Sequence, residues 1–321
     1  MNLRSRLWQK AMIGLATNRR MKDAMQQWAT ASRLASRYVG GGTVEEGVRV
    51  AVNLHTDGIK PSLFYLGEYL HDRVAIEETV AKKICAAQLL GKGDLDVHVS
   101  VDPTQLGLSI DRDLCERNAI RIAEAVGASC QRSNGTHCMM LDMEDDELVT
   151  ATIEVHDLIQ QQGLPVAITL QAYLRRTKDD LQTKVQQGAK VRLVKGAFAA
   201  NSDIAYTSSR SIRKNYLALS EIALSNEARE TGFYASFATH DHILLKEIVR
   251  MAAARGWEPG TYEFEMLYGV RSQLAEQLAA DGQKVRVYMP FGTDWWPYAL
   301  RRLGESPKNL LLLVRAILSR A

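Results

Sequence analysis

Short apolar runs rich in β-branched residues alternate with helical segments from about residue 60 onward, and this alternation constrains the fold more than any other feature of the chain. Eight runs have the length of a buried strand. The predicted strands begin near Ser62, Val97, Cys138, Val166, Val191, Ala235, Tyr262 and Val285. Strands that are separated by helices pair in parallel, so the pattern predicts a protein of the α/β class.

Helical periodicity marks the segments between these strands, at residues 77–90, 114–126, 147–161, 179–187, 242–254 and 271–280. Eight strand–helix units over about 240 residues match the size of a (β/α)8 barrel. A doubly wound sheet is the competing architecture, but no G-x-G-x-x-G follows the first strand. The sequence therefore predicts a TIM-type barrel over residues 56–321.

The first 55 residues are predicted to form a helical N-terminal arm, because apolar residues recur there at helical spacing. Gly40-Gly41-Gly42 interrupts the arm without a strand before it, which indicates a hinge rather than a dinucleotide-binding turn. Thr43, followed by Glu45 and Glu46, is typical of a helix start with acidic residues in the first turn.

Composition excludes several classes of protein. The formal net charge is only +3, and no basic stripe with interleaved aromatic residues occurs, so nucleic acid is not an expected partner. No apolar stretch approaches the roughly 18 residues of a membrane span, and the basic N-terminus lacks the apolar core of a secretory signal. The four cysteines have no C-x-x-C spacing and are expected to be free thiols, which favours a cytoplasmic location.

Polar side chains follow most of the predicted strands, where a barrel enzyme carries its chemistry. In chain order these are Glu68, Asp102, Gln105, Asp142, Glu144, Gln171, Tyr173, Arg192, Lys195, Thr239, His240, Asp241, Glu265 and Tyr288. Individually they also have structural interpretations; Asp241, for example, is a suitable helix N-cap. Asp142, Glu144, His240 and Asp241 lack the clustered spacing of metal ligands, so no metal site is predicted.

A charged face on the last helix is the sharpest local signal. At 100° per residue, Tyr298, Arg301, Arg302 and Glu305 occupy one arc of about 100°. An exposed face with an Arg301–Glu305 ion pair is one interpretation. Capture of a small carboxylate by two guanidinium groups beside a phenol is the other, with Glu305 orienting one of them.

Several motifs occur together in a fixed order. They are Leu66-Gly67-Glu68, Leu141-Asp142-Met143-Glu144, Arg192-Leu193-Val194-Lys195-Gly196-Ala197, Ala238-Thr239-His240, Phe264-Glu265-Met266-Leu267-Tyr268-Gly269, Tyr288-Met289-Pro290-Phe291-Gly292 and Tyr298-Ala299-Leu300-Arg301-Arg302-Leu303-Gly304-Glu305. From about Tyr38 to the C-terminus the chain resembles the flavin-dependent proline dehydrogenase (proline oxidase) family in its monofunctional form. The resemblance implies a distorted (β/α)8 barrel that holds FAD at the carboxyl ends of the strands.

The resemblance also implies a reaction: oxidation of L-proline to Δ1-pyrroline-5-carboxylate by hydride transfer to the flavin N5, with the electrons passed to a quinone. Asp142 and Arg192 resemble the catalytic pair, and a cation such as Arg192 near the flavin suits the anionic reduced form. The residues that resemble flavin contacts are Met143, Gln171, Arg192, Lys195, Gly196, Ala197, Thr239 and His240. The residues that resemble the substrate pocket are Tyr288, Tyr298, Arg301, Arg302 and Glu305, with Asp102 at the strand-two position.

Position 102 departs from the family, in which a lysine that helps to hold the substrate carboxylate follows Val-Ser-Val. Asp102 stands there in this chain, and no lysine occurs between Lys92 and Lys178 to replace it. Phe198 and Asp241 also stand where tyrosine and asparagine are usual. Two hypotheses follow: a substrate whose carboxylate is masked, or an Asp102 that pairs with Arg301 or Arg302 and weakens proline binding.

Alternatives remain open at this stage. Lys195 at a strand end suits a Schiff-base lyase on the same barrel, and a flavin-binding relative without turnover is a non-catalytic interpretation. The N-terminal arm either packs against the barrel or another subunit, or lies on a membrane surface where it would favour delivery of electrons to a quinone. A further expected partner is a pyrroline-5-carboxylate dehydrogenase that receives the product.

Overall fold

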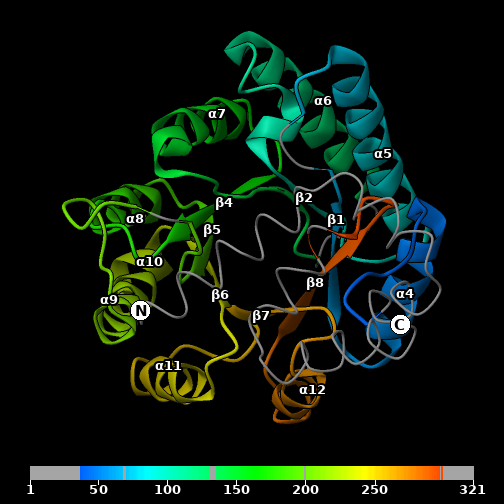
Figure 1. Ribbon diagram of the computed structural model, residues 1–321. Helices are drawn as coiled ribbons and strands as arrows, with labels where there is room; N and C mark the ends of the chain where they lie inside the picture. Colours follow the sequence, from blue (N-terminus) through cyan, green and yellow to red (C-terminus); the bar gives the residue numbers. More distant parts are fainter. Residues whose placement is uncertain (1–36, 68–69, 131–134, 199, 297, 299–321) are drawn as a thin grey trace, which may run out of the picture.

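A computed structural model describes residues 37–67, 70–130, 135–198, 200–296 and 298 of the chain (Figure 1). Its centre is a closed barrel of eight parallel strands in the order β1 to β8, with β1 paired to β8. The strands are β1 (Lys60–Tyr65), β2 (His98–Val101), β3 (Cys138–Leu141), β4 (Val166–Gln171), β5 (Lys190–Val194), β6 (Tyr234–Ala238), β7 (Glu263–Leu267) and β8 (Val285–Phe291). The barrel predicted from the alternating pattern is confirmed, and every strand begins within two residues of its predicted start.

The barrel strands are buried on both faces, which explains why their sequences are nearly continuous apolar runs. All six residues of β4 are buried, as are all four of β3. One face of each strand packs against the surrounding helices and the other fills the barrel. A polar residue within such a run, for example Arg192 in β5, therefore points either into the barrel or into the helix layer.

Helices surround the barrel (Figure 1). They are α4 (Val44–Thr56), α5 (Arg73–Lys92), α6 (Arg112–Ser129), α7 (Val149–Gln161), α8 (Thr177–Gln186), α9 (Ser209–Ala223), α10 (Asn226–Glu230), α11 (His242–Ala254) and α12 (Ser272–Ala280), with 3₁₀ turns η1 (Pro103–Leu106) and η2 (Asp146–Leu148). The six predicted helices are present. Helices α9 and α10 were not predicted, although about 40 residues separate the starts of strands five and six.

Helix α4 lies within the predicted N-terminal arm and begins where the sequence indicates. The Thr43 hydroxyl accepts a hydrogen bond from the Glu46 backbone N–H at 3.3 Å, which caps the helix. The glycine segment before it is not a hinge, because Gly40 N–H donates to the Pro290 carbonyl at 2.7 Å and Gly292 N–H donates to the Gly41 carbonyl at 2.8 Å. This segment is bonded to the end of β8, and α4 packs against β1, β8 and α5.

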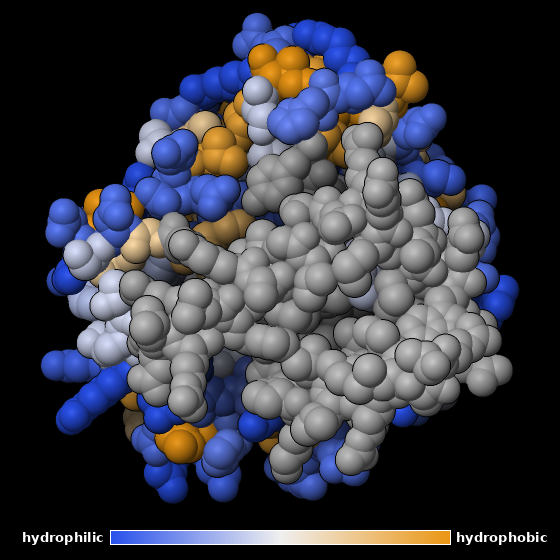
Figure 2. Space-filling view, in the orientation of Figure 1, coloured by the Kyte–Doolittle hydropathy of each residue, from blue (hydrophilic) through white to orange (hydrophobic). Residues whose placement is uncertain are grey.

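The outer surface of the peripheral helices is mostly hydrophilic (Figure 2). Among the residues that the structure describes, no helix is both long and apolar enough to cross a bilayer. For the predicted N-terminal arm at 1–55, which packs on the barrel or lies on a membrane, the structure shows α4 packed on the barrel, and residues 1–36 lie outside the described part of the chain.

In the described part of the chain, two buried ion clusters occupy the barrel: one is centred on Arg192, and the second is centred on Arg286 at the level of the first residues of the strands. The Arg286 guanidinium, fully buried, bonds Glu263 at 2.7 and 3.0 Å and Asp96 at 2.9 Å. Its remaining amino group donates to the Pro61 carbonyl at 2.7 Å. Removal of one partner from this cluster would leave a buried unpaired charge and would lower the free energy of unfolding of the barrel.

Candidate active site

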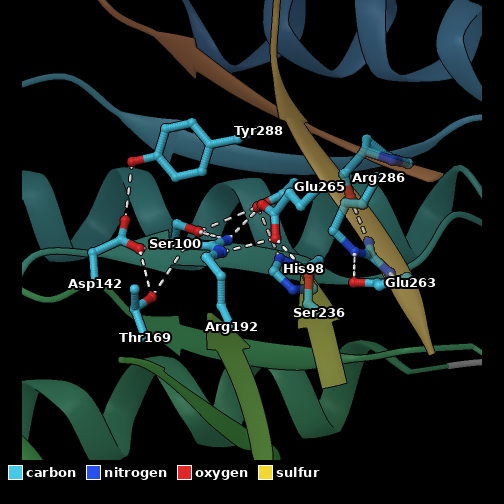
Figure 3. A network of polar contacts seen from close by, with 12 residues as sticks. His98, Ser100, Asp142, Thr169, Arg192, Ser236, Glu263, Glu265, Arg286 and Tyr288 are labelled. Carbon is cyan, nitrogen blue, oxygen red and sulfur yellow. Dashed lines mark hydrogen bonds and ion pairs between the residues drawn. The ribbon is translucent and has the colours of Figure 1, made fainter. Parts of the chain in front are cut away.

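Arg192 projects from β5 into the barrel and organises a network of polar side chains (Figure 3). Its guanidinium makes a two-pronged ion pair with Glu265 of β7, with N–O distances of 2.7 and 2.6 Å. The same group bonds the Asp142 carboxylate and, at 3.0 Å, the Ser100 hydroxyl. With only 3% of its surface exposed, Arg192 is held in one position by partners from four strands or strand ends.

Asp142, directly after β3, is the more accessible member of this network, since 14% of its side chain is exposed against 4% for Arg192. The Tyr288 hydroxyl donates to its Oδ2 at 2.9 Å, and the Thr169 hydroxyl donates to its Oδ1 at 3.2 Å. The Arg192 guanidinium also lies over the Tyr288 ring, 5.2 Å from its centre. A ligand that enters the barrel therefore meets Asp142 and Tyr288 before it meets Arg192.

Burial and charge set the protonation states of this network. Burial raises the pKa of both Asp142 and Glu265, and the charge of Arg192 opposes that effect. Burial works against the charge of Arg192, but Glu265 and Asp142 together raise its pKa. Burial also raises the pKa of Tyr288 well above its usual range, so the phenol is a hydrogen-bond donor at neutral pH.

Gln171, at the end of β4, links two neighbouring strand ends. Its amide nitrogen donates to the carbonyls of Glu144 and Met143 at 3.1 and 3.4 Å. Its amide oxygen is buried and, within the described residues, has no hydrogen-bond partner. An unpartnered buried acceptor is costly unless a ligand supplies a donor, and Gln171 was predicted from the sequence to contact the flavin.

Gly196, in the turn after β5, has a φ of +96°, a conformation that glycine adopts freely. A β-carbon at this position would overlap the ring of Tyr173, so only glycine allows the turn to pack this closely against that ring.

The other predicted flavin contacts differ in exposure. Met143 and Thr239 are each 6% exposed, whereas Ala197, in the same turn as Gly196, is exposed.

Lys195 forms an ion pair, whereas a lysine that forms a Schiff base must react as an unpaired amine. Its Nζ lies 2.9 Å from Asp241, and Arg213 bonds the same carboxylate oxygen at 2.7 Å. Burial opposes ionisation of Asp241, but Lys195 and Arg213 lower its pKa to about 2. Asp241 also caps α11 through the Ile243 N–H at 3.2 Å, as the sequence allowed. Asp241 stands where the family usually has asparagine, and Lys195 and Arg213 balance the negative charge that this difference introduces.

His240 joins two strand ends. Its Nε2 accepts a hydrogen bond from the Leu267 N–H at 2.9 Å, and its carbonyl accepts one from Arg271 at 3.0 Å. Glu144, in the motif of Asp142, likewise holds the turn after β2, because it accepts hydrogen bonds from the Thr104 N–H at 2.9 Å and the Thr104 hydroxyl at 2.6 Å. Both residues position the rim of the barrel.

Tyr298 is 6% exposed and lies close enough to Tyr288 for the charge of one phenolate to raise the pKa of the other. The other members of the predicted carboxylate-binding face, Arg301, Arg302 and Glu305, lie outside the described residues. Their roles stay predictions.

Asp102 follows β2 at the start of the η1 turn, where its backbone N–H donates to the Gln105 side chain at 3.4 Å. The sequence has no lysine between Lys92 and Lys178 to replace the family lysine, but the structure brings a lysine from outside this range close to the site. Lys83, from helix α5, is fully buried; burial lowers its pKa to about 8, and the nearby charges of Asp102 and Asp142 oppose that effect. A lysine that precedes the strand in sequence thus lies near the site.

Comparison with known proteins decides the family. The profile of the family described as proline dehydrogenase matches residues 47–311 of this chain. The chain belongs to the proline dehydrogenase family. Proline dehydrogenase of Deinococcus radiodurans is 33% identical over 322 residues, which is 97% of this chain and 98% of that relative. Proline dehydrogenase 2 of Bacillus subtilis is 30% identical over 278 residues, 86% of this chain and 88% of that relative.

Solved structures with the proline dehydrogenase fold show the same barrel. Proline utilization A (PutA) from Bdellovibrio bacteriovorus has a TM-score of 0.77 at 21% identity, over 85% of this chain and 32% of that chain. PutA from Corynebacterium freiburgense has a TM-score of 0.73 at 20% identity, over 95% of this chain and 34% of that chain. This proline dehydrogenase family member thus spans about a third of these PutA chains, and at such identities the likeness concerns the fold.

Sequence reasoning missed two charged members of the site. Glu265 was noted as a polar residue in a strand but received no role; its spacing from Glu263 places both carboxylates on one face of β7, where each meets an arginine. Lys83 had no signal other than being a lysine on the buried face of a predicted helix.

Proposed function

We propose that the protein oxidises L-proline to Δ1-pyrroline-5-carboxylate with FAD as its cofactor, and that the electrons pass to a quinone. Membership of the proline dehydrogenase family supports the substrate and the reaction class. One observation supports this assignment at the level of the site: the Asp142–Arg192 pair, with Tyr288 on Asp142, lies inside the barrel, and Asp142 stands at the carboxyl end of β3, the end at which barrel enzymes bind their ligands.

The residues present fit a flavin. Gln171 offers a buried acceptor for an N–H of the ring, and the close packing of Gly196 on Tyr173 fixes the turn after β5 beside it. Lys195, after β5, and Arg213, on α9, share the single carboxylate of Asp241, so this corner keeps a net positive charge that suits the phosphates of FAD. Met143, Ala197, Thr239 and His240 complete the proposed contacts. When bound, the flavin takes up the hydride that leaves the proline ring.

The protein supplies position, charge and proton control for this reaction. The substrate nitrogen must be neutral when the hydride leaves the neighbouring ring carbon, because its lone pair forms the new C=N bond. Asp142 is the accessible carboxylate in the barrel and is the group we assign to hold the amine N–H. Arg192, buried and fixed by Glu265, holds Asp142 in place and contributes positive charge at the flavin.

The carboxylate of the substrate needs cations at the other side of the pocket. We assign Arg301 and Arg302 to this role, with Glu305 as the orienting partner of Arg301 and with Tyr288 and Tyr298 as walls for the ring. Because Lys83 compensates the charge of Asp102, free L-proline is favoured over a substrate with a masked carboxylate. The ion pair of Lys195 and the family assignment argue against a Schiff-base lyase.

Turnover with a soluble quinone analogue tests this function. We expect the purified protein, loaded with FAD, to reduce the quinone in the presence of L-proline and to release a cyclic imine that an aromatic amino-aldehyde traps. L-Prolinamide, which lacks the carboxylate, should be a much poorer substrate. Turnover of the amide in preference to proline would instead support the masked-carboxylate alternative.

Replacement of Gly196 by alanine is expected to reduce the FAD content of the purified protein to less than about a tenth, because the new methyl group overlaps Tyr173 and the φ of +96° is unfavourable for alanine. The absorbance ratio of flavin to protein measures this. Gly163→Ala is the matched control: its φ is +70°, but nothing lies within 4 Å of the added carbon. It should lose stability and keep its flavin.

The remaining assignments extend this proposal. We place the protein in the cytoplasm, with the quinone reached at the membrane surface, and we divide the chain into an N-terminal arm at 1–55 and a catalytic barrel at 56–321. The product is a cyclic imine, and relatives such as PutA of Escherichia coli are described as bifunctional. We therefore propose hand-over of the product to a pyrroline-5-carboxylate dehydrogenase.

A further inference from the structure

Lys83 reaches from the helix layer through the wall of the barrel. It lies on α5, outside the sheet, yet its Nζ donates to the Ser100 carbonyl at 3.0 Å and sits 4.9 Å from the centre of the Phe64 ring. Phe64 faces the interior, because its ring stacks on Tyr288 with centres 5.3 Å apart. The ammonium group is therefore next to a ring that forms part of the proposed substrate pocket.

Lys83 meets the barrel wall where β1 and β2 pair. These strands pair at only two positions, Leu63 with Val99 and Phe64 with Ser100, whereas β2 and β3 pair at four. The Val101 carbonyl accepts from Asp142 N–H on the β3 side, so the Ser100 carbonyl points to the β1 side. Lys83 Nζ donates to this carbonyl from the side of the helix layer, at the end of the paired stretch of β1 and β2.

The ammonium group is incompletely satisfied. Lys83 is fully buried and has three N–H donors, but within the described residues it makes a single hydrogen bond. Burial lowers its pKa to about 8, while the charges of Asp102 and Asp142 oppose that effect. Asp142 is already bonded to Arg192, Thr169 and Tyr288. A buried cation of this kind is suited to an anionic ligand.

We propose that Lys83 is a substrate-binding residue whose ammonium group pairs with the carboxylate of the proline substrate beside β1 and β2. The assignment rests on the proposed function, which supplies the ligand. It gives the site a cation in place of the lysine that Asp102 replaces, delivered from a helix rather than from the strand end. Asp102 then balances the charge of Lys83 before the substrate arrives.

Binding of a non-oxidisable carboxylate tests this proposal without turnover. The probe is oxolane-2-carboxylate, a five-membered ring with oxygen in place of the amine, and calorimetry on the FAD-loaded protein gives its dissociation constant. We expect Lys83→Met to weaken binding by at least about 30-fold. Lys83→Gln, which keeps a donor for the Ser100 carbonyl, should weaken it similarly and serves if the methionine variant folds poorly.

Lys184→Met is the matched control. Lys184 is also a buried lysine on a barrel helix, 1% exposed, but it pairs with Asp157 and bonds Gln187 at 3.0 Å on α8. This variant should lose thermal stability and bind the probe within about twofold of the unmodified protein. Equal weakening in both variants would show that loss of a buried lysine acts through the fold, and would overturn the assignment.

A double variant distinguishes two roles of Lys83: direct contact with the substrate carboxylate, and neutralisation of the charge of Asp102. If Lys83 only neutralises Asp102, then Lys83→Met combined with Asp102→Asn should bind the probe as well as the unmodified protein, and the proposal is wrong. If Lys83 contacts the carboxylate, the double variant stays at least about tenfold weaker. Failure of the proposed function is distinguishable, because L-proline would then produce no turnover in the unmodified protein whatever the probe does.

The pH dependence of binding supplies an independent readout. The described charges that act most on Lys83 are Asp102 at the end of β2 and Asp142 at the end of β3. Because the folded-state pKa is lowered to about 8, the ammonium form is present below that pH and is lost above it. Probe affinity should fall as pH rises through this region, and Lys83→Met should show no such fall; an unchanged profile would overturn the proposal.

Discussion

Replacement of Arg192 by methionine is expected to lower kcat/KM for L-proline by about a thousandfold or more. The change removes the cation that we place at the flavin, and it leaves the carboxylates of Asp142 and Glu265 facing each other across the barrel. An unpaired buried charge costs on the order of 3–5 kcal/mol, so the free energy of unfolding should fall as well. Steady-state kinetics and chemical denaturation measure the two effects.

Arg286→Met provides the matched control because it removes the equivalent group from the second buried cluster. Arg286 is likewise fully buried and pairs with Glu263 and Asp96, but none of its partners belongs to the proposed site. It should destabilise the protein to a similar degree while the folded fraction keeps its kcat/KM within about threefold. A similar loss of activity in both variants would mean that Arg192 acts through stability alone.

Asp142→Asn is expected to lower kcat/KM by about a hundredfold. The amide keeps the shape of the side chain and a partner for Tyr288, but it cannot carry the charge that we assign to hold the substrate amine. Arg192 retains its two-pronged ion pair with Glu265, so the loss of stability should be smaller than in the Arg192 variant. Single-turnover kinetics with L-proline measure the chemical step directly.

The corresponding control is Asp96→Asn, a buried aspartate that bonds Arg286 at 2.9 Å in the second cluster. It should leave the rate of the chemical step unchanged. An Asp142→Asn variant that reacts as fast as the unmodified protein would exclude Asp142 from the reaction and reduce it to a structural partner of Arg192.

The fold could be predicted because its determinants are local. Parallel strands covered on both faces require continuous apolar runs, and the amphipathic segments between them have helical periodicity. Helices α9 and α10, in the long connection after β5, were not predicted, although Tyr216, Ser220 and Ala223 recur at helical spacing on the buried face of α9. The glycine segment 40–42 was misinterpreted as a hinge, since its bonds to β8 join residues about 250 positions apart.

Prediction of the site was less complete for a related reason. Residues at strand ends, such as Asp142 and Gln171, could be found because a barrel gathers all its strand ends at one rim. Glu265 lies within a strand, and its role depends on which side chain it meets across the barrel. Lys83 lies on a helix, and its contact with the Ser100 carbonyl depends on how α5 packs against β1 and β2. Contacts across the sheet leave no periodic pattern in the sequence.

The measurement that tests the central claim most directly is the visible absorbance of the purified, FAD-loaded protein during anaerobic titration with L-proline. We predict that the flavin absorbance is bleached by L-proline, with Δ1-pyrroline-5-carboxylate as the product, and that Arg192→Met slows the bleaching by about a thousandfold or more. Flavin absorbance that persists in excess L-proline, or a protein that binds no FAD, would contradict the assignment of this barrel as a flavin-dependent proline dehydrogenase.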